Sequence, residues 1–255
     1  MASGTRNSWL AVDVGNSQIK IGLFTTSAEK GTSRSEVEPP LSDSSGALPE
    51  CLDFHVLPLD GRVRWDEIFD DRPSLDAHRI VIVGSNQQGV DQVVDEWPEW
   101  LSSPEVIRSS ASFPISVEVD EPRRVGFDRL LNAVAANRLR DPQVPSVIVS
   151  CGTATTVDLV SASGSFCGGA IMPGFTLCAR ALNQYTEVLP LISMDELFDL
   201  PPSEDCHPAL GSNTQAAIMS GVFWGQIGAV RELVVRLGQS VQAGNKNQWM
   251  GNQVM

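Results

Sequence analysis

The segment that runs from Asp13 to Lys20 has the residue types of a phosphate-binding turn. Its members are Asp13, Val14, Gly15, Asn16, Ser17, Gln18, Ile19 and Lys20. A tight Gly-Asn-Ser turn can direct backbone N–H groups and a hydroxyl at phosphate oxygens, and a carboxylate such as Asp13 can hold a hydrated Mg²⁺. An ordinary hairpin turn has the same composition, so this octapeptide alone fits either structure.

A second segment of small and hydroxylic residues runs from Cys151 to Asp158 (CGTATTVD). Two phosphate loops, one in each half and facing each other across a cleft, are typical of the superfamily of acetate and sugar kinases and actin-type ATPases. The coincidence of both loops favours a nucleotide site over two unrelated turns. Asp158 either lies near the metal or satisfies backbone donors in its own strand.

The residues Gly126-Phe127-Asp128-Arg129 stand at the start of a stretch whose apolar residues recur at helical spacing. Asp128 could act as a general base on a substrate hydroxyl, and Arg129 could hold an anionic group. Phosphoryl transfer to an alcohol needs both of these tasks. The alternative is an ordinary helix N-terminus, where a first-turn acid is stabilised by the helix dipole.

Two further segments could line a binding site. The first runs from Gly168 to Phe175 (GGAIMPGF), where glycines and a Pro-Gly pair let backbone line a pocket closely. The second, from Leu210 to Thr214, leads into an apolar segment, and Thr214 could donate to a substrate oxygen. A plain turn and a helix N-cap are the respective alternatives.

The elements that must position these residues follow from hydrophobic spacing and turn signals. We expect a hairpin of strands 9–14 and 20–24 and a buried strand at 79–84. Strands at 147–149 and 156–160 flank the second loop. Helices are expected at 92–101, 127–140 and 214–237. Residues 25–50 predict a long, mobile connection or insertion, and residues 239–255 show no convincing element.

Composition excludes one class of function. The 255 residues include 31 acids against 18 lysines and arginines, for a net charge of −13. A sequence-independent nucleic-acid binder needs clustered cations instead. A hydrophobic content of 42% is enough for a sizeable core, in one large domain or two small ones.

The cysteines and the apolar runs indicate the compartment. The five cysteines form no CxxC pair and the three histidines are scattered, so we expect reduced thiols and no zinc site. No run approaches the roughly 18 consecutive apolar residues of a membrane span, and residues 1–10 lack the apolar core of a signal peptide. We therefore expect a cytoplasmic protein without a membrane or nucleic-acid partner.

Taken together, the five segments resemble the type III pantothenate kinases in order and spacing, from Trp9 to Leu233. That family has DxGN(S/T)xxK, GxDR, GTAxTxD, GGxIxPG and GxxT before a Gly-spaced helix. The resemblance implies an α/β fold of two ribonuclease H-like/actin-like ATPase domains, of mixed β-sheet with flanking helices around a nucleotide cleft. The expected domains are residues 1–122 and 123–255.

The resemblance also implies roles. Residues 13–20 and Thr153 would bind ATP, with Mg²⁺ held by Asp13 through water. Asp128 would deprotonate pantothenate, giving 4'-phosphopantothenate in the first step of coenzyme A biosynthesis. The residues expected to hold the substrate are Gly126, Phe127, Asp128, Arg129 and Thr214. Family members are homodimers with the substrate site at the interface, so the small-residue face of helix 214–237 is the expected dimer contact.

Three departures from the family pattern bear on activity. Ser150 stands where the family has an Asp that binds K⁺ or NH₄⁺, so a neutral oxygen replaces a charged ligand and K⁺ dependence is in question. Residues 117–122 lack the aromatic residue expected near pantothenate. Residues 239–255 lack the Thr-Gly-Gly turn near the nucleotide, which indicates truncation or divergence and weakened ATP binding.

Two alternatives stay open at this point. The first is a catalytically impaired member of the fold that acts as a binding or regulatory protein. The second is another activity of the superfamily, such as a sugar or acetyl kinase or a polyphosphate phosphatase. The GxDR and GxxT segments disfavour the second, since both belong to the pantothenate kinase pattern.

Overall fold

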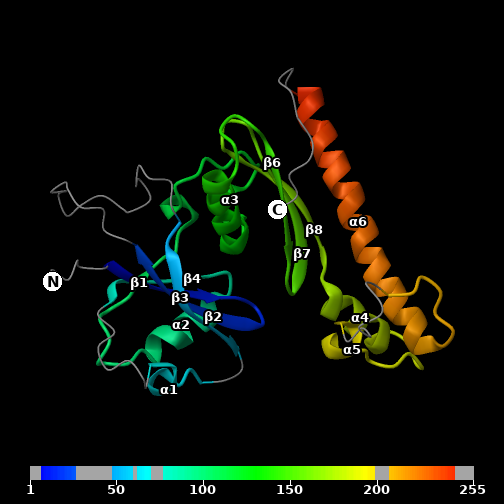
Figure 1. The fold of residues 1–255 in the computed structure, drawn as a ribbon, viewed down its shortest axis with the longest axis horizontal. Coiled ribbons are helices and arrows are strands. Elements are labelled where there is room, and N and C mark those ends of the chain that lie inside the picture. Colours follow the sequence, from blue (N-terminus) through cyan, green and yellow to red (C-terminus); the bar gives the residue numbers. More distant parts are fainter. Residues whose placement is uncertain (1–6, 27–47, 60–61, 70–76, 199–206, 245–255) are drawn as a thin grey trace. The chain divides into compact units, whose positions relative to one another are not determined.

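A computed structural model describes residues 7–26, 48–59, 62–69, 77–198 and 207–244. The chain divides into two compact units, Met1–Ser112 with Gly126–Asp128, and Phe113–Val125 with Arg129–Met255. The boundary predicted at residue 122 therefore falls within the 113–125 segment of the second unit. Figure 1 shows the elements of both units, which are described separately below.

The first unit is built on a five-stranded sheet of order β3-β2-β1-β4-β5. Its strands are β1 (Asn7–Val14), β2 (Gln18–Thr26), β3 (Glu50–Pro58), β4 (Ala77–Gly84) and β5 (Glu105–Val106). β1 pairs antiparallel with β2 and parallel with β4. The predicted hairpin and the strand at 79–84 are thus confirmed.

Strand β3 was not predicted. It pairs antiparallel with β2 along the sheet edge, and Glu50, at the end of the expected connection, is its first residue. The residues just before Glu50 are rich in Ser and Pro, so the sequence showed no clear start for this strand. The expected connection also overlaps β2, which extends to Thr26, while residues 27–47 lie outside the described residues.

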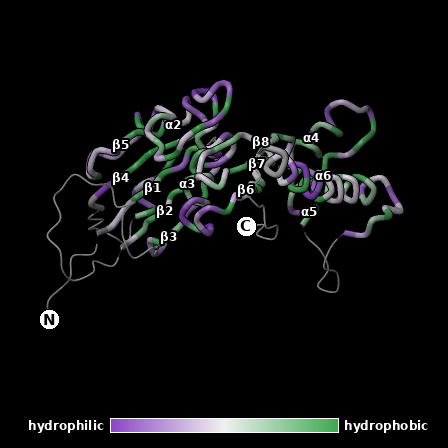
Figure 2. The backbone as a smooth tube through the Cα atoms, turned by 90° about the horizontal axis from the view of Figure 1, so that it is seen from above, coloured by the Kyte–Doolittle hydropathy of each residue, from purple (hydrophilic) through white to green (hydrophobic). Residues whose placement is uncertain are grey.

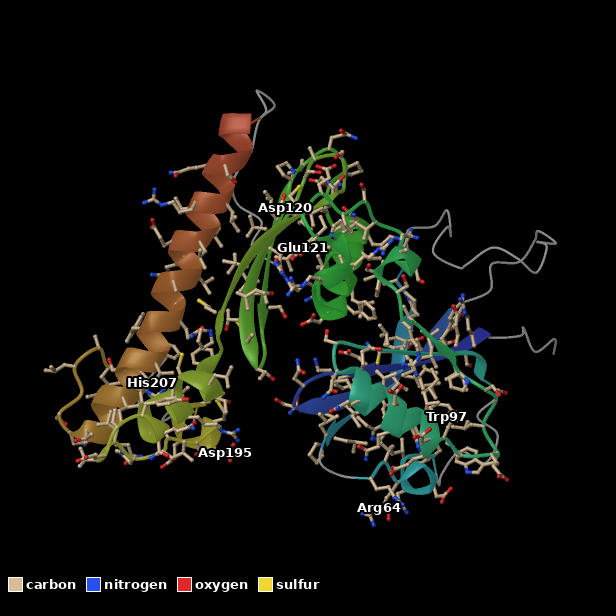
Figure 3. The ribbon with its side chains drawn as sticks, turned by 180° about the vertical axis from the view of Figure 1, so that it is seen from behind. Arg64, Trp97, Asp120, Glu121, Asp195 and His207 are labelled. Atoms are coloured by element: carbon tan, nitrogen blue, oxygen red, sulfur yellow. The ribbon has the colours of Figure 1, made fainter. Side chains whose placement is uncertain are left out.

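The core of the first unit joins apolar strand residues to two helices, α1 (Trp65–Phe69) and α2 (Gln87–Asp95). Figure 2 shows the hydropathy along these elements. Trp97, labelled in Figure 3, meets Trp65 edge-on with ring centroids 4.7 Å apart.

The helix predicted at 92–101 is wrong in both bounds. Asn86 caps α2 by accepting from the Gly89 N–H at 3.0 Å, so the helix begins before Gln92, and it ends at Asp95.

The second unit holds an antiparallel sheet of order β6-β7-β8. The strands are β6 (Ser146–Cys151), β7 (Ala154–Val160) and β8 (Phe166–Pro173). The helices are α3 (Phe127–Leu139), whose first two residues are assigned to the first unit, α4 (Phe175–Gln184), α5 (Met194–Phe198) and α6 (Thr214–Gly244). A short 3₁₀ turn lies at Pro122–Arg124, and another, Ser110–Ser112, belongs to the first unit. The predicted α/β class is confirmed.

The long helix α6 packs one apolar stripe on the sheet of its own unit. Val230, Leu233, Val234 and Leu237 contact the cluster of Val147, Val157 and Leu159. The helix continues to Gly244, so the expectation of no element from residue 239 is wrong for 239–244, while 245–255 lie outside the described residues.

Helix α6 also meets a length and composition test for a membrane span. Among the described residues, Thr214–Ser240 is the one helix that does so, and 22% of its apolar window is buried. Core helices of soluble proteins pass the same test, and several apolar side chains of α6 pack against the sheet. The expectation of no membrane partner stays a prediction.

Candidate active site

The hairpin turn between β1 and β2 places a carboxylate and an ammonium group on neighbouring strands. Asp13 is the register partner of Lys20, and Lys20 Nζ lies 3.9 Å from Asp13 Oδ2. The Gly15 N–H donates to the Gln18 carbonyl at 2.9 Å and closes the turn. The side chains between them, Asn16, Ser17 and Gln18, are exposed. The turn thus presents amide and hydroxyl groups beside the Asp13 carboxylate and the Lys20 ammonium group.

The pKa of Asp13 is raised in the folded chain. Burial raises the pKa of Asp13, the Lys20 ammonium lowers it, and the Asp128 carboxylate raises it again. The Ser85 hydroxyl donates to Asp128 Oδ1 and the Asn86 N–H donates to the Val14 carbonyl, so hydrogen bonds link the neighbourhoods of Asp13 and Asp128 within the first unit. A divalent cation would offset both the burial and the carboxylate repulsion, and oxygen ligands are what Mg²⁺ prefers. The residues present fit a Mg²⁺–nucleotide complex.

Asp128 is held by a residue that the sequence did not single out. The Ser85 hydroxyl donates to Asp128 Oδ1 at 2.9 Å and accepts from the Asp128 N–H at 3.3 Å. Ser85 directly follows β4 and lies 43 positions before Asp128. A lone serine after the strand RIVIVG carries no sequence signal of this contact. The Asp128 side chain otherwise stands exposed at the start of α3.

Arg129 is occupied by a buried carboxylate. Its Nε donates to Asp158 Oδ1 and Oδ2 at 3.0 and 3.2 Å, and its Nη2 also donates to Oδ1. The Asp158 side chain is 1% exposed and that of Arg129 14%. The Arg129 guanidinium also lies 5.2 Å from the Phe166 ring centroid. Asp158 therefore orients Arg129, a role that the sequence did not predict, and its expected place near the metal stays a prediction.

The second loop joins β6 to β7, and the backbone of Gly174 packs against it. The Gly152 N–H donates to the Ala154 carbonyl at 3.0 Å, and the Gly174 N–H donates to the Thr153 carbonyl at 3.1 Å. A Cβ at position 174 would overlap the carbonyl oxygens of Gly152 and Thr153. The Pro-Gly pair thus permits close backbone packing, and the Thr153 side chain is exposed above it.

Ser150 lies opposite Thr156 on the neighbouring strand. Directly opposed residues of an antiparallel pair project on the same face, with Cβ atoms about 5 Å apart. Thr156 Oγ1 is buried with no hydrogen-bond partner among the described residues, and so is Thr155 Oγ1. Buried hydroxyls without a partner need an explanation such as an ion or a water. Neutral oxygens of this kind suit a monovalent cation.

Thr214 is the first residue of α6, and Asn213 supplies the cap. The Ala216 N–H donates to Asn213 Oδ1 at 2.9 Å, and the Ala217 N–H donates to the Asn213 carbonyl at 2.9 Å. The segment Leu210–Thr214 thus caps the helix, as the alternative expected, but the capping side chain is that of Asn213 and not of Thr214. The Thr214 side chain is exposed at the helix start, where backbone donors favour anionic or polar ligands.

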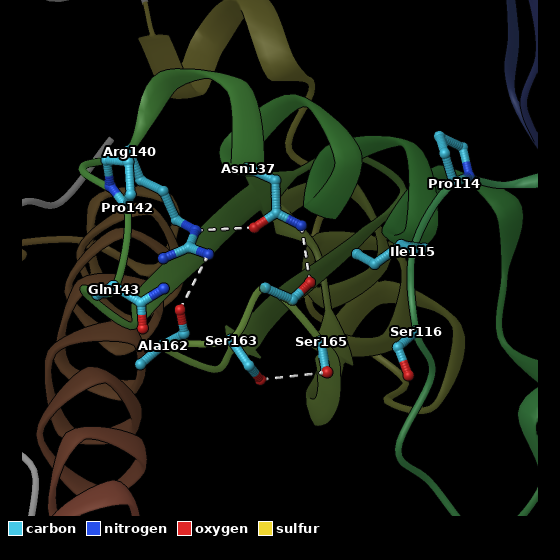
Figure 4. Close-up of a pocket in the computed structure, with 11 residues that line it drawn as sticks. Pro114, Ile115, Ser116, Asn137, Arg140, Pro142, Gln143, Ala162, Ser163 and Ser165 are labelled. Carbon is cyan, nitrogen blue, oxygen red and sulfur yellow. Dashed lines mark hydrogen bonds between the residues drawn. The ribbon is translucent and has the colours of Figure 1, made fainter. Parts of the chain in front are cut away.

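A cavity of about 320 Å³ lies at the other end of α3, within the second unit. Figure 4 shows Arg140 among the residues that line it, with hydrogen bonds to Asn137 and Ala162. This guanidinium donates to Asn137 Oδ1 at 2.7 Å and to the carbonyls of Val144 and Ala162. These hydrogen bonds join α3 to the loops that follow it. We assign no ligand to this cavity.

Comparison with known proteins identifies the family. A family model described as type III pantothenate kinase matches residues 9–236. The type III pantothenate kinase of Dehalococcoides mccartyi (strain CBDB1) is 41% identical over 235 residues, which cover 89% of this chain and 78% of that protein. That of Gluconobacter oxydans (strain 621H) is 39% identical over 146 residues, 57% of this chain and 50% of that protein. The chain thus spans about half the length of the second relative.

A likeness to solved structures is weaker. The activator of the 2-hydroxyisocaproyl-CoA dehydratase from Clostridium difficile, with bound ADPNP, gives a TM-score of 0.39 at 10% identity, covering 98% of this chain and 77% of that one. The assignment rests instead on the family model, which matches most of the chain, and on the Dehalococcoides relative. The resemblance seen in the sequence is confirmed: this chain belongs to the type III pantothenate kinase family.

Proposed function

We propose that this chain transfers the γ-phosphate of ATP to the primary hydroxyl of pantothenate, giving 4'-phosphopantothenate, the first step of coenzyme A biosynthesis. Family membership supports the reaction class. The observation that carries the residue assignment is geometric: Ser85 holds the Asp128 carboxylate, and the next residue, Asn86, donates its N–H to the carbonyl of Val14, which follows Asp13. This arrangement provides a base and a metal-binding carboxylate in one site, which phosphoryl transfer to an alcohol requires.

The roles proposed for the residues follow from their surroundings. Residues 13–20 and Thr153 bind the nucleotide phosphates, and Asp13 holds Mg²⁺ through water. Bound Mg²⁺ supplies charge neutralisation at the phosphates. Asp128 accepts the proton of the pantothenate hydroxyl. Gly126, Phe127, Arg129 and Thr214 hold the substrate, and Arg129 offers a fixed cation because Asp158 locks one edge of its guanidinium.

Turnover with and without the base tests the proposal. We expect Asp128→Asn to lower kcat by roughly 10²- to 10⁴-fold, the usual contribution of a general base. A coupled assay with pantothenate, ATP and Mg²⁺ measures this. Asp95→Asn, an exposed acid at the end of α2, is the matched control and should retain full activity. Pantothenate binding without turnover in the unaltered chain would instead indicate a binding or regulatory protein.

We propose that a monovalent cation, K⁺ or NH₄⁺, binds at Ser150 with the Thr156 hydroxyl as a neighbouring ligand. The unpartnered, buried Thr156 Oγ1 supports this assignment. K⁺ should raise Tm relative to tetramethylammonium, and Thr156→Val, which keeps the shape, should abolish that rise. Val147→Ile, a buried change on β6, is the control and should keep the K⁺ effect. An equal K⁺ effect in Thr156→Val contradicts the site.

We propose a homodimer that uses the glycine face of α6, formed by Gly221, Gly225 and Gly228. A Cβ at any of the three would meet no atom of the described chain within 4 Å, so a second backbone can approach. Gly225→Trp should then give a monomer by light scattering. Gly225→Ala should keep the dimer and add about 0.5–1 kcal/mol of helix stability. A dimeric Gly225→Trp variant would contradict this interface.

We propose a cytoplasmic location, in keeping with the thiols. Among the described residues Cys51, Cys151, Cys167 and Cys178 are free, and Cys51 and Cys151 are exposed. Exposed free thiols persist where the compartment is reducing. Fractionation of cells that express the tagged chain tests the location.

A further inference from the structure

Ser85 makes two hydrogen bonds to one residue, Asp128. Its hydroxyl donates to Asp128 Oδ1 at 2.9 Å, and its oxygen accepts from the Asp128 N–H at 3.3 Å. The two bonds join the backbone and the carboxylate of the same residue through a single oxygen. They therefore restrict the Asp128 side-chain torsions, which an exposed aspartate would otherwise sample in several staggered rotamers.

The effect on a general base is specific. Ser85 donates to Oδ1, so Oδ2 is the carboxylate oxygen that Ser85 leaves without a hydrogen bond, and we take it as the acceptor of the substrate proton. A base must lie within hydrogen-bond reach of that proton, and a displacement of about 1 Å can lower the rate about 10²-fold. A carboxylate fixed before the substrate arrives loses less conformational freedom on reaching the transition state.

Ser85 is itself held firmly. It follows the buried strand β4, which ends at Gly84, and precedes the capped helix α2. The Asn86 N–H donates to the Val14 carbonyl at 3.4 Å, and Gln87 Nε2 donates to the Gly84 carbonyl at 2.9 Å. Ser85 is thereby anchored to the strand end that begins the first phosphate turn. The anchor of the base and the nucleotide turn share one rigid support.

Gly126 fits this arrangement. A Cβ at position 126 would lie 2.5 Å from Asp128 Oδ1 and 3.7 Å from Ser85 Oγ. Any other residue would push Oδ1 away from the Ser85 hydroxyl. The glycine of the GxDR segment thus leaves room for the Ser85–Asp128 bond.

We propose that Ser85 is a positioning residue for the general base, which it holds in one rotamer for proton abstraction. This inference rests on the proposed function. A purely structural role is the competing explanation, because the Ser85 oxygen also accepts one of the N–H groups at the start of α3. The two roles differ in what a substitution changes, turnover in one case and stability alone in the other.

Kinetics of Ser85→Ala and Ser85→Thr distinguish them. We expect Ser85→Ala to lower kcat and kcat/KM alike by roughly 10- to 100-fold. The KM for ATP should stay within about twofold, since Ser85 is not assigned to the nucleotide. Ser85→Thr keeps the hydroxyl and should restore kcat to within about threefold. Ser103→Ala, an exposed serine of the same unit, is the control and should match the unaltered chain.

The outcomes separate this inference from the proposed function. If Asp128→Asn abolishes turnover while Ser85→Ala lowers only Tm, the function stands and the positioning role is overturned. If the unaltered chain does not phosphorylate pantothenate, the proposed function fails and the inference with it. A crystal structure of Ser85→Ala gives a readout independent of activity: several Asp128 rotamers support the inference, and one unchanged rotamer overturns it.

Discussion

Asp128 and Arg129 are neighbours in sequence but have separate supports. Ser85, 43 positions earlier, holds the first, and Asp158, 29 positions later, holds the second. Each support belongs to the same unit as the residue it holds. The proposed base, Asp128, and the cation, Arg129, can therefore be perturbed one at a time by substitutions at their supports.

Removing the support of Arg129 should be costly for stability. Asp158→Asn leaves a guanidinium that is 14% exposed without its carboxylate, and breaking a buried pair costs about 3–5 kcal/mol. Urea unfolding measures the loss. Glu105→Gln, which breaks the exposed pair with Arg79, is the control and should cost at most about 1 kcal/mol. Similar losses in the two variants would show that Asp158 is not an essential partner.

Asp13 should make stability depend on pH. Burial raises the pKa of Asp13 above 3.8, so the folded chain binds more protons than the unfolded chain just above that pH. The stability that Asp13 contributes is full below its unfolded pKa and is lost as pH rises through the raised pKa. Asp13→Asn should therefore be more stable than the unaltered chain near neutral pH.

Urea midpoints across the acid range test this sign. The advantage of Asp13→Asn should shrink as pH falls toward 3.8, because the native carboxyl is then protonated as well. Asp95→Asn serves as the exposed control. A pH-independent difference between Asp13→Asn and the unaltered chain would contradict the burial of Asp13.

At the scale of elements, Arg140 ties the C-terminal end of α3 to the loops around it. Arg140→Lys keeps the charge but loses the planar fork that reaches Asn137, Val144 and Ala162. We expect a loss of about 1–3 kcal/mol in the free energy of unfolding. The control is Arg138→Lys, at an exposed position of α3 two residues earlier. It should change the free energy of unfolding by less than about 0.5 kcal/mol. Equal effects would contradict the joining role.

The sequence predicted elements where local signals were strong. The Gly-Asn turn gave the β1–β2 hairpin, and helical spacing gave α3 and α6. The start of α2 was missed because the Asn86 cap was overlooked, and β3 because its upstream neighbours are turn-rich. Ser85 and Asp158 could not be assigned, since their partners lie 43 and 29 positions away and only the fold brings them together.

At the scale of the whole molecule, a net charge of −13 opposes the two anionic substrates of the proposed reaction, ATP and pantothenate. Salt screens this repulsion beyond roughly 8–10 Å at physiological ionic strength, while short contacts in the site are screened less. We expect kcat/KM for pantothenate to rise a few-fold, by about two- to tenfold, as ionic strength increases.

The salt series needs fixed K⁺ and Mg²⁺, with tetramethylammonium chloride as the variable salt, so that no ligand concentration changes. A neutral amide of pantothenate is the matched control, and its kcat/KM should depend less on ionic strength. A fall in kcat/KM for pantothenate would show that local cations such as Lys20 and Arg129 outweigh the overall charge.

The pairing of Asp13 with Lys20 across the β1–β2 turn constrains how this sequence can change in evolution. Side chains alternate between the faces of a strand, so inserting or deleting one residue in the turn would move Lys20 to the opposite face. Substitutions at the exposed Asn16 or Ser17 leave the pairing intact. For folding alone, the turn should therefore accept new side chains but not a new length. A loop-exchange library that keeps the residue count and varies the identities would separate the folding of the turn from its proposed role in phosphate binding.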